Sequence, residues 1–386
     1  MTADLIRFLA DVAFAASIIS CLYVIFCMRC IPAFLSRKSQ SAEFYPPVTI
    51  LKPLCGMEHE LYENLRSFCE QDYLDYQVVF CVRGADDPSA DIARRIMAKF
   101  SHLDIALVVD GSIHGANLKV SNLINMMSMV KHEILVIADS DMRVGPDYLA
   151  AIVSPFRTVS TGAVTCLYQA TPAATLASRF GAMHINADFL PSVLVASTLS
   201  DIHFCFGATI AVRRTVLNAI GGLHSIVDVL ADDYQLGKRV SEAGFTVCLS
   251  DYVVENIVHE PDFKSLLQHE LRWARTVRAS SPWGYAGSIL THPLPLALLF
   301  LAVSGGSLAG LFMTMVAVAL RLRLRHCVQQ GFGIQGKPMY CMGLLRDLLS
   351  AVVWFAGLTG RMVRWKGGRF SVDRRGRLHA LERSAP

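Results

Sequence analysis

Two long stretches without any charged residue constrain the fold of this chain more than any other feature. No charge occurs from Val12 to Met28, and none from Pro293 to Leu320. A helix of about 20 apolar residues crosses the hydrocarbon core of a bilayer and satisfies its own backbone there. These stretches therefore predict membrane-embedded helices near both ends of the chain.

The first apolar stretch predicts a transmembrane anchor over residues 1–35. It has no small-residue cleavage site, so we expect it to remain on the protein. Arg29 and Arg37 follow it closely, and basic residues accumulate on the cytoplasmic side of membrane helices. The region after the anchor is therefore expected on the cytoplasmic face of the cell (inner) membrane.

The C-terminal apolar stretches leave the number of membrane crossings open. The stretch ending at Leu320 exceeds the length of one crossing and contains Ser304-Gly305-Gly306-Ser307, which fits one tilted helix or a re-entrant pair. A further stretch, Met339 to Gly360, is interrupted by Arg346-Asp347. We expect a multi-pass protein with two to three C-terminal membrane elements. The expected domains are an anchor over 1–35, a catalytic-type domain over 45–285, transmembrane or interfacial helices over 290–362 and a basic cytoplasmic tail over 363–386.

Composition narrows the possible partners and the compartment. The net charge is only +4, which argues against a nucleic-acid surface, and the basic residues gather at the ends of apolar runs, where lipid headgroups are their natural partners. The 11 cysteines are scattered without regular spacing, which indicates a reducing compartment rather than a disulfide framework. The lipid bilayer, and no nucleic acid, is therefore expected as a partner.

Residues 45–285 alternate between short β-branched runs and stretches with helical periodicity. The expected strands are Val48–Leu51, Gln77–Val82, Ile105–Val109 and Ile134–Ala138, and the expected helices are Glu58–Gln71, Asp87–Phe100 and Asn117–Val130. Such alternation predicts an α/β domain with a mostly parallel sheet covered by helices on both faces. Ligands bind beyond the carboxyl ends of such strands, so functional residues should follow the apolar runs.

Acidic residues do follow two of these runs. Asp86 and Asp87 come after the second expected strand, where a carboxylate can bind a base or a ribose; alone, the motif fits a helix N-cap better, with Pro88 at the first helical position. Asp139 and Asp141 come directly after the fourth expected strand, where they suit Mg²⁺ or Mn²⁺ bound to a diphosphate. The alternative for this pair is a turn closed by an Asx hydrogen bond.

A third acidic pair, Asp232-Asp233, opens an expected helix. Acidic residues are favourable at a helix start, which is the simpler interpretation. In a cleft, two adjacent carboxylates repel, so one holds its proton more tightly and can act as a general base. We predict Asp233 as the base and Asp232 as its supporting partner.

A basic and aromatic segment follows in residues 269–278. Arg272 can bind diphosphate oxygens, and Trp273 can wall a sugar or acceptor site. The alternative is an interfacial helix that touches lipid headgroups. Lys52 and Lys119 are further candidates for steadying a nucleotide, although a lysine is more often only solvated surface.

The order of these motifs resembles the ceramide glucosyltransferase family (glycosyltransferase family 21), including its bacterial branch that glycosylates hopanoid lipids. The resemblance spans about residues 48–280 together with the flanking apolar stretches. The motifs are Leu51-Lys52-Pro53-Leu54, Asp86-Asp87-Pro88, Asn117-x-Lys119-x-x-Asn122-Leu123, Asp139-Ser140-Asp141, Gly221-Gly222-Leu223, Asp232-Asp233-Tyr234 and Arg272-Trp273.

The resemblance implies a GT-A (Rossmann-like) catalytic domain, inverting chemistry, a UDP-sugar donor and Mn²⁺ or Mg²⁺. By position, it implies that Asp86 or Asp87 touches the nucleotide, that Asp139 and Asp141 serve the metal and diphosphate, and that Asp233 is the base. It also places Arg272 and Trp273 with the donor. The family's last motif usually opens with Gln or Arg, and His269 stands there instead, so the donor contact of His269 is open.

The expected function is transfer of glucose or N-acetylglucosamine from a UDP-sugar to a lipid hydroxyl, on ceramide or a hopanoid. The apolar residues of Phe180–Leu199 fit either a groove for a membrane lipid acceptor or core packing. A processive polysaccharide synthase is the first alternative, but it needs more spanning helices. A non-catalytic membrane scaffold is the second, and it leaves the ordered acidic groups unexplained.

Overall fold

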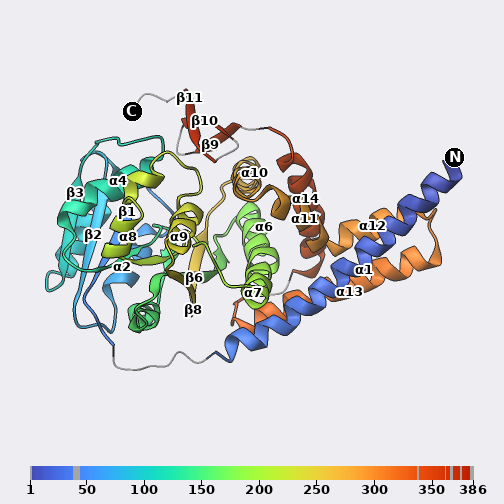
Figure 1. Cartoon of the computed structure of the whole chain (residues 1–386), viewed down its shortest axis with the longest axis horizontal. Helices are drawn as coiled ribbons and strands as arrows, with labels where there is room; N and C mark the ends of the chain where they lie inside the picture. Colours follow the sequence, from blue (N-terminus) through green and yellow to red (C-terminus); the bar gives the residue numbers. More distant parts are fainter. Residues whose placement is uncertain are drawn as a thin grey trace. The chain divides into compact units, whose positions relative to one another are not determined.

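The structure is a computed structural model that describes residues 2–37, 44–336, 339–360, 362–365, 368–373 and 376–382. The chain forms two compact units, each built from separate segments (Figure 1). The sheet unit contains 37–173, 200–259 and 362–386. The helical unit contains 1–36, 174–199 and 260–361.

The sheet unit is an eight-stranded mixed sheet with helices packed against it (Figure 1). Its strand order is β3-β2-β1-β4-β7-β6-β8-β5, in which β3, β2, β1 and β4 are parallel neighbours. The strands are β1 (Val48–Pro53), β2 (Tyr76–Val82), β3 (Asp104–Val109), β4 (Ile134–Ile137), β5 (Met142–Arg143), β6 (Thr161–Pro172), β7 (Ile210–Arg213) and β8 (Thr246–Val258). The helices are α2 (Leu61–Cys69), α3 (Pro88–Lys99), α4 (Leu118–Met126), α5 (Tyr148–Val153), α8 (Arg214–Ala219) and α9 (Asp232–Glu242), with 3-10 turns η1 (Met127–Met129), η2 (Ser154–Arg157) and η4 (Leu223–Ile226).

The parallel half of the sheet follows from the apolar runs of the sequence. Every residue of β1, β2 and β4 is buried, as expected for strands covered on both faces. The core beside them includes Phe68 and Tyr148, whose rings pack edge to face with centroids 5.5 Å apart. The α/β fold predicted from the sequence is thereby confirmed, with the four expected strands and three expected helices at their positions.

A small antiparallel sheet forms near the C-terminus, in the order β11-β10-β9. Its strands are β9 (Met362–Trp365), β10 (Gly368–Val372) and β11 (Leu378–Glu382). From the sequence, residues 363–386 are expected only as a basic cytoplasmic tail. In the structure it belongs to the sheet unit, although the preceding residues 260–361 belong to the helical unit.

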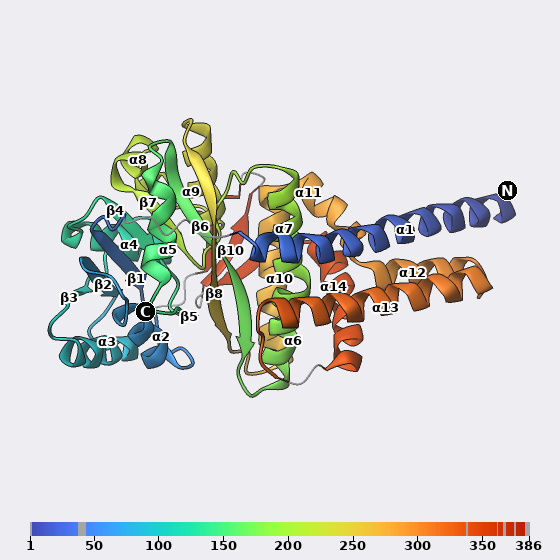
Figure 2. The same ribbon diagram turned by 90° about the horizontal axis from the view of Figure 1, so that it is seen from below.

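The helical unit contains the apolar stretches. Its helices are α1 (Thr2–Leu35), α6 (Leu176–His184), α7 (Leu190–Leu199), α10 (Phe263–Ser280), α11 (Pro282–Gly287), α12 (Pro293–Val303), α13 (Leu308–Gly331) and α14 (Tyr340–Gly357), with the π-helix η3 (Ile185–Phe189) and the 3-10 turn η5 (Ser288–Thr291). Helices α1, α12 and α13 run side by side (Figure 2). Residues 174–199 lie within the range expected for the catalytic-type domain, but they pack in the helical unit. The functional limits of that domain stay a prediction.

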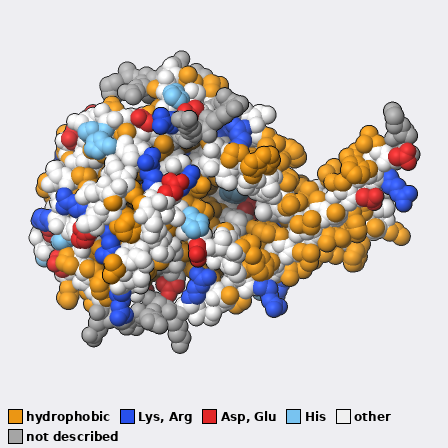
Figure 3. Space-filling view, viewed as in Figure 1, with side chains coloured by type: hydrophobic (Ala, Val, Ile, Leu, Met, Phe, Trp, Pro, Cys, Tyr) orange, Lys and Arg blue, Asp and Glu red, His pale blue; other side chains and the backbone are white. Residues whose placement is uncertain are grey.

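Two helices of the described chain are long and apolar enough to cross a membrane, α1 from Asp4 and α14. A bent pair, Pro282–Thr291 with Pro293–Val303, would bring the number to three if it forms one span. Hydrophobic side chains cover the visible face of α1, α12 and α13 (Figure 3). Exposed examples are Leu5, Ile6, Phe8, Leu22, Leu311, Phe312 and Met315. Such a surface fits lipid contact, since soluble proteins rarely expose large apolar patches.

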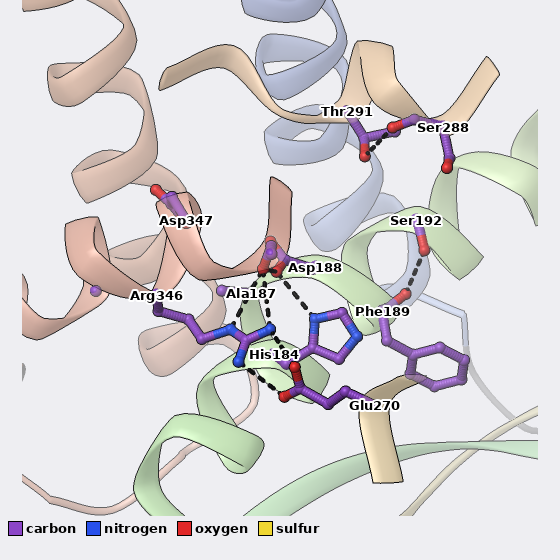
Figure 4. A network of polar contacts seen from close by, with 12 residues as sticks. His184, Ala187, Asp188, Phe189, Ser192, Glu270, Ser288, Thr291, Arg346 and Asp347 are labelled. Carbon is purple, nitrogen blue, oxygen red and sulfur yellow. Dashed lines mark hydrogen bonds and ion pairs between the residues drawn. The ribbon is translucent and has the colours of Figure 1, made fainter. Parts of the chain in front are cut away.

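Buried ion pairs hold the helical unit together away from this surface. Arg346 of α14 donates two hydrogen bonds to Glu270 of α10, at 2.7 and 2.9 Å (Figure 4). Arg321 of α13 bridges Asp188 of η3 and Asp347 of α14, with contacts of 2.6 and 2.5 Å. The Arg346-Asp347 interruption noted in the sequence is therefore a pair of inward-facing anchors for α14.

Candidate active site

Strands β1 and β4 bring the first two charged groups together at their carboxyl ends. Lys52 is fully buried in β1, and its Nζ donates a 2.5 Å hydrogen bond to the backbone carbonyl of Asp139, just after β4. Burial lowers the pKa of Lys52 to about 7, against the opposing effect of Asp139 and Asp141. The ring of Phe68 lies 3.7 Å from the same amine. In this position Lys52 fixes the backbone of the acidic loop.

Asp141 is held by a side chain of strand β8. Asn256 donates a 3.0 Å hydrogen bond from Nδ2 to Oδ2 of Asp141. Burial, with Glu58 and Asp139 nearby, raises the pKa of Asp141 to about 7. A cation close to this carboxyl group would lower its pKa and favour the ionised form.

Lys119 joins two of the acidic groups. From the first turn of α4 its Nζ reaches Oδ1 of Asp139 at 2.6 Å and Oδ2 of Asp232 at 3.4 Å. Burial acts to lower the pKa of Lys119, but the charges of Asp139 and Asp232 outweigh it and raise the pKa above its ordinary value. Lys119 therefore stays charged and links the end of β4 to the start of α9.

Asn117 supports the same link from its position as N-cap of α4. Its Oδ1 accepts a hydrogen bond from the Val120 amide, and its Nδ2 donates to Oδ1 of Asp232 at 3.2 Å. Both residues are buried. Both carboxylate oxygens of Asp232 are thus in use: Oδ1 accepts from Asn117, and Oδ2 pairs with Lys119. This arrangement suits a supporting role.

The carboxylates of Asp233 and Asp139 converge beside Gly207. A Cβ atom at Gly207 would lie 3.2 Å from Oδ2 of Asp139 and 3.3 Å from Oδ2 of Asp233, so the glycine leaves room for both carboxylates. Gly237 serves a similar purpose on α9, where a Cβ would meet the backbone of Phe204 and Cys205 at 2.4–2.6 Å. Burial, and then the charge of Asp232, raise the pKa of Asp233 to about 6.

The pair Asp86-Asp87 lies beyond the end of β2 and has other contacts. Oδ1 of Asp87 accepts hydrogen bonds from the amide and hydroxyl of Ser89, so Asp87 caps α3 as the simpler interpretation of the motif predicted. Asp87 also accepts from the amide of Gly56. Asp86 is exposed. Nucleotide contact by either residue stays a prediction.

His269, Arg272 and Trp273 lie on α10, in the helical unit. His269 makes a 2.7 Å contact between Nδ1 and Oε1 of Glu260, and its ring lies 4.2 Å from that of Trp273. Burial lowers the pKa of His269, against the effect of Glu260. These contacts fix the ring of Trp273 on α10. The donor contacts expected of the three residues stay a prediction.

The acidic residues fit a cation that arrives with its substrate. Within the described ranges, no group of three or more His, Cys, Asp and Glu side chains is arranged to hold a metal ion. Mg²⁺-type sites, however, commonly use one or two carboxylates with substrate phosphates and water. Asp139 and Asp141 supply hard oxygens of this kind, and of the two carboxylate oxygens of Asp139 it is Oδ1 that pairs with Lys119.

Three supporting residues were missed as site residues by the sequence analysis. Asn117 stood in a quoted motif without a role, whereas Asn256 and Gly207 carried no local signal. Asn256 comes from β8, more than a hundred residues after Asp141, so only strand pairing reveals the contact.

An α/β sheet with acidic groups at its carboxyl edge, in a chain that also forms apolar helices, fits a membrane glycosyltransferase of the GT-A type. The profile of Glycosyl transferase family 21 matches residues 12–378, and the chain belongs to this family. It is therefore an enzyme, which speaks against the scaffold alternative.

Relatives and solved structures agree with this assignment. Ceramide glucosyltransferase 3 of Caenorhabditis elegans is 23% identical over 350 residues, covering 88% of this chain and 75% of the relative. Ceramide glucosyltransferase of Komagataella phaffii is 33% identical over 128 residues, covering 32% of this chain and 25% of the relative. A mannosyltransferase of Pyrobaculum calidifontis, solved with GDP-Man and Mn²⁺, shares the fold with a TM-score of 0.57 at 20% identity, covering 92% and 99% of the two chains.

Proposed function

We propose that this enzyme transfers a hexose from a UDP-sugar to a hydroxyl group of a membrane lipid. The observation that carries the proposal is the convergence of the Asp139 and Asp233 carboxylates beside the Cα of Gly207. One carboxylate follows β4, where a nucleotide-sugar diphosphate is expected, and the other begins α9. The sugar carbon to be attacked would lie between a diphosphate end and a base end of this site.

In this mechanism Asp233 accepts the proton of the lipid hydroxyl as the oxygen attacks the anomeric carbon. A single in-line displacement inverts that carbon, and the nucleoside diphosphate leaves. Lys119 forms an ion pair with Asp232, which offsets part of the negative charge beside the base. A bound Mg²⁺ or Mn²⁺, held by Asp139 and Asp141, would supply charge stabilisation for the leaving diphosphate.

The acceptor is proposed to be ceramide or a hopanoid, taken from the membrane surface. The apolar helices and the relatives named as ceramide glucosyltransferases support a lipid acceptor. UDP-glucose with ceramide and UDP-N-acetylglucosamine with a hopanoid are the two pairs to compare. The proposed site of action is the cytoplasmic face of the cell membrane.

Mass spectrometry of lipid products tests this function. Purified enzyme in detergent receives Mn²⁺ or Mg²⁺, one UDP-sugar at a time, and ceramide or a hopanoid. The expected result is a hexose or N-acetylhexosamine mass gain on one lipid that disappears in Asp139→Ala and persists in the control Asp91→Asn. Asp91 pairs with Arg94 at the exposed surface of α3. Release of UDP without any lipid product would contradict the proposed acceptor.

A further inference from the structure

The segment before the proposed base has no regular structure of its own. Residues 227–231 connect η4 to α9 and end directly before Asp232 and Asp233. Outside helices and ladders, a backbone position is set by the hydrogen bonds and packing that others provide. The orientation of Asp233 therefore depends on what holds this segment.

One side of the segment is held by the residues that open α4. The amide of Ala116 donates to Oδ1 of Asp228 at 2.8 Å, and the amide of Asn117 donates to the carbonyl of Val227 at 2.8 Å. Nδ2 of Asn117 also donates to the carbonyl of Val229 at 3.0 Å. These contacts connect the segment to the side of the site that carries Lys119.

The other side is held by the small C-terminal sheet. The amide of Leu230 donates to the carbonyl of Gly376 at 3.1 Å, and the amide of Leu378 donates to the carbonyl of Asp228 at 2.8 Å. Between these bonds Val229 and Arg377 form an antiparallel bridge. The C-terminal sheet thus adds a short ladder to the segment that leads into the base.

The turn that presents this ladder depends on one glycine. Gly376 has φ of 75°, and its amide donates to the carbonyl of Asp373 at 3.1 Å. Asparagine adopts this left-handed region fairly often, whereas a β-branched residue there is strained. A Cβ at Gly376 meets no atom of the described residues within 4 Å, so its backbone conformation is what limits the residue that fits.

We propose that the C-terminal sheet β9–β11 is a positioning element of the active site, which orients Asp232 and Asp233 through its ladder to residues 228–230. The inference rests on the proposed role of Asp233. It assigns to β9–β11 a part in catalysis, where the sequence predicted only a basic cytoplasmic tail. Donor binding, centred on Asp139 and Asp141 at the end of β4, should be largely independent of it.

The matched pair Gly376→Val and Gly376→Asn tests the ladder. Gly376→Val should lower kcat by about tenfold, because small misplacements of a catalytic group cost one to two orders of magnitude. Gly376→Asn should stay within about twofold of the native kcat, because asparagine tolerates the required φ. KM for the UDP-sugar should change little in either variant. Equal kcat in both variants and the native enzyme would overturn the proposal.

The stoichiometry of UDP binding by full-length Gly376→Val, measured on the sample used for kcat, is the second test. The expected variant binds one UDP per chain as before but turns over about tenfold more slowly. Loss of UDP binding would show that this turn is needed for folding of the unit and would also overturn a specific positioning role. A native enzyme that makes no glycolipid would instead count against the proposed function.

Discussion

At the scale of single residues, the site depends on the different electrostatic surroundings of its carboxylates. Lys119 stays protonated between Asp139 and Asp232. Asp233 is left with a raised pKa of about 6, which burial and Asp232 cause. A base of this kind is ionised at neutral pH yet basic enough to accept a proton from a hydroxyl group during attack.

The pKa of Asp233 predicts the acidic limb of the pH profile. The base acts only when deprotonated, and its pKa is raised, so kcat should fall as pH drops through about 6 and level off above it. Steady-state kcat at saturating substrate, with UDP binding followed at each pH, provides the measurement. A kcat that keeps its neutral value well below this pH would contradict the assignment of Asp233.

Gly207 is predicted to be essential for the approach of the two carboxylates. In Gly207→Ala the new Cβ would lie 3.2 and 3.3 Å from Oδ2 of Asp139 and of Asp233, so both must move. We expect kcat to fall by about tenfold or more. Gly287→Ala is the control, because a Cβ there meets nothing within 4 Å. Unchanged kcat in Gly207→Ala would show that the carboxylates do not need this spacing.

At the scale of elements, buried ion pairs fix α10 and α14 to each other. Arg346 and Glu270 are 0% and 3% exposed, and they form a bidentate pair. Near the C-terminal end of α14, Arg278 donates to the carbonyl of Gly357 at 2.6 Å, and Arg275 to that of Thr359 at 3.3 Å. These two arginines of α10 thus hydrogen-bond to carbonyls at the C-terminal end of α14.

Breaking the buried pair should strongly destabilise the helical unit. Arg346→Ala leaves the Glu270 carboxylate buried without its partner, which costs about 3–5 kcal/mol. Thermal unfolding in detergent should show a clearly lowered Tm. Lys131→Ala removes the exposed pair with Asp104 and should change stability by no more than about 1 kcal/mol. Similar Tm values for both variants would refute the structural importance of the buried pair.

The sequence predicted those elements whose pattern is local. The apolar runs of β1, β2 and β4 and the cap of α3 at Asp87 could be read directly, because burial on both faces and capping leave local signals. The contact of Asn256 with Asp141 and the packing of residues 174–199 in the helical unit could not, because they depend on pairing between distant segments. The same holds for the C-terminal sheet, whose partners lie at residues 228–230.

At the scale of the whole molecule, the C-terminal sheet restricts the membrane topology. The chain leaves the sheet unit after His259 and returns to it at Met362. Since residues 376–378 are hydrogen-bonded to residues 228–230, both must lie on the same side of the membrane. The number of crossings between these two points must therefore be even.

Because this number is even, α14 cannot be the single membrane crossing between His259 and Met362. Helix α12 has only 11 residues, about 16 Å at 1.5 Å per residue, which is too short to span a bilayer. A re-entrant pair of α12 and α13 contributes no net crossing. A cysteine introduced at Arg377 and one in the sheet unit at Lys131 should react with a membrane-impermeant maleimide from the same side, in a background without the exposed Cys55 and Cys341. Labelling from opposite sides would contradict the topology.

Asp233 is the proposed base of lipid glycosylation in this site. The most direct measurement is the rate of glycolipid formation by Asp233→Asn, with UDP binding determined on the same sample. We predict that turnover falls by about two to four orders of magnitude, the usual contribution of a general base, while UDP binding stays close to native. Turnover near the native rate, with UDP bound as before, would contradict the account.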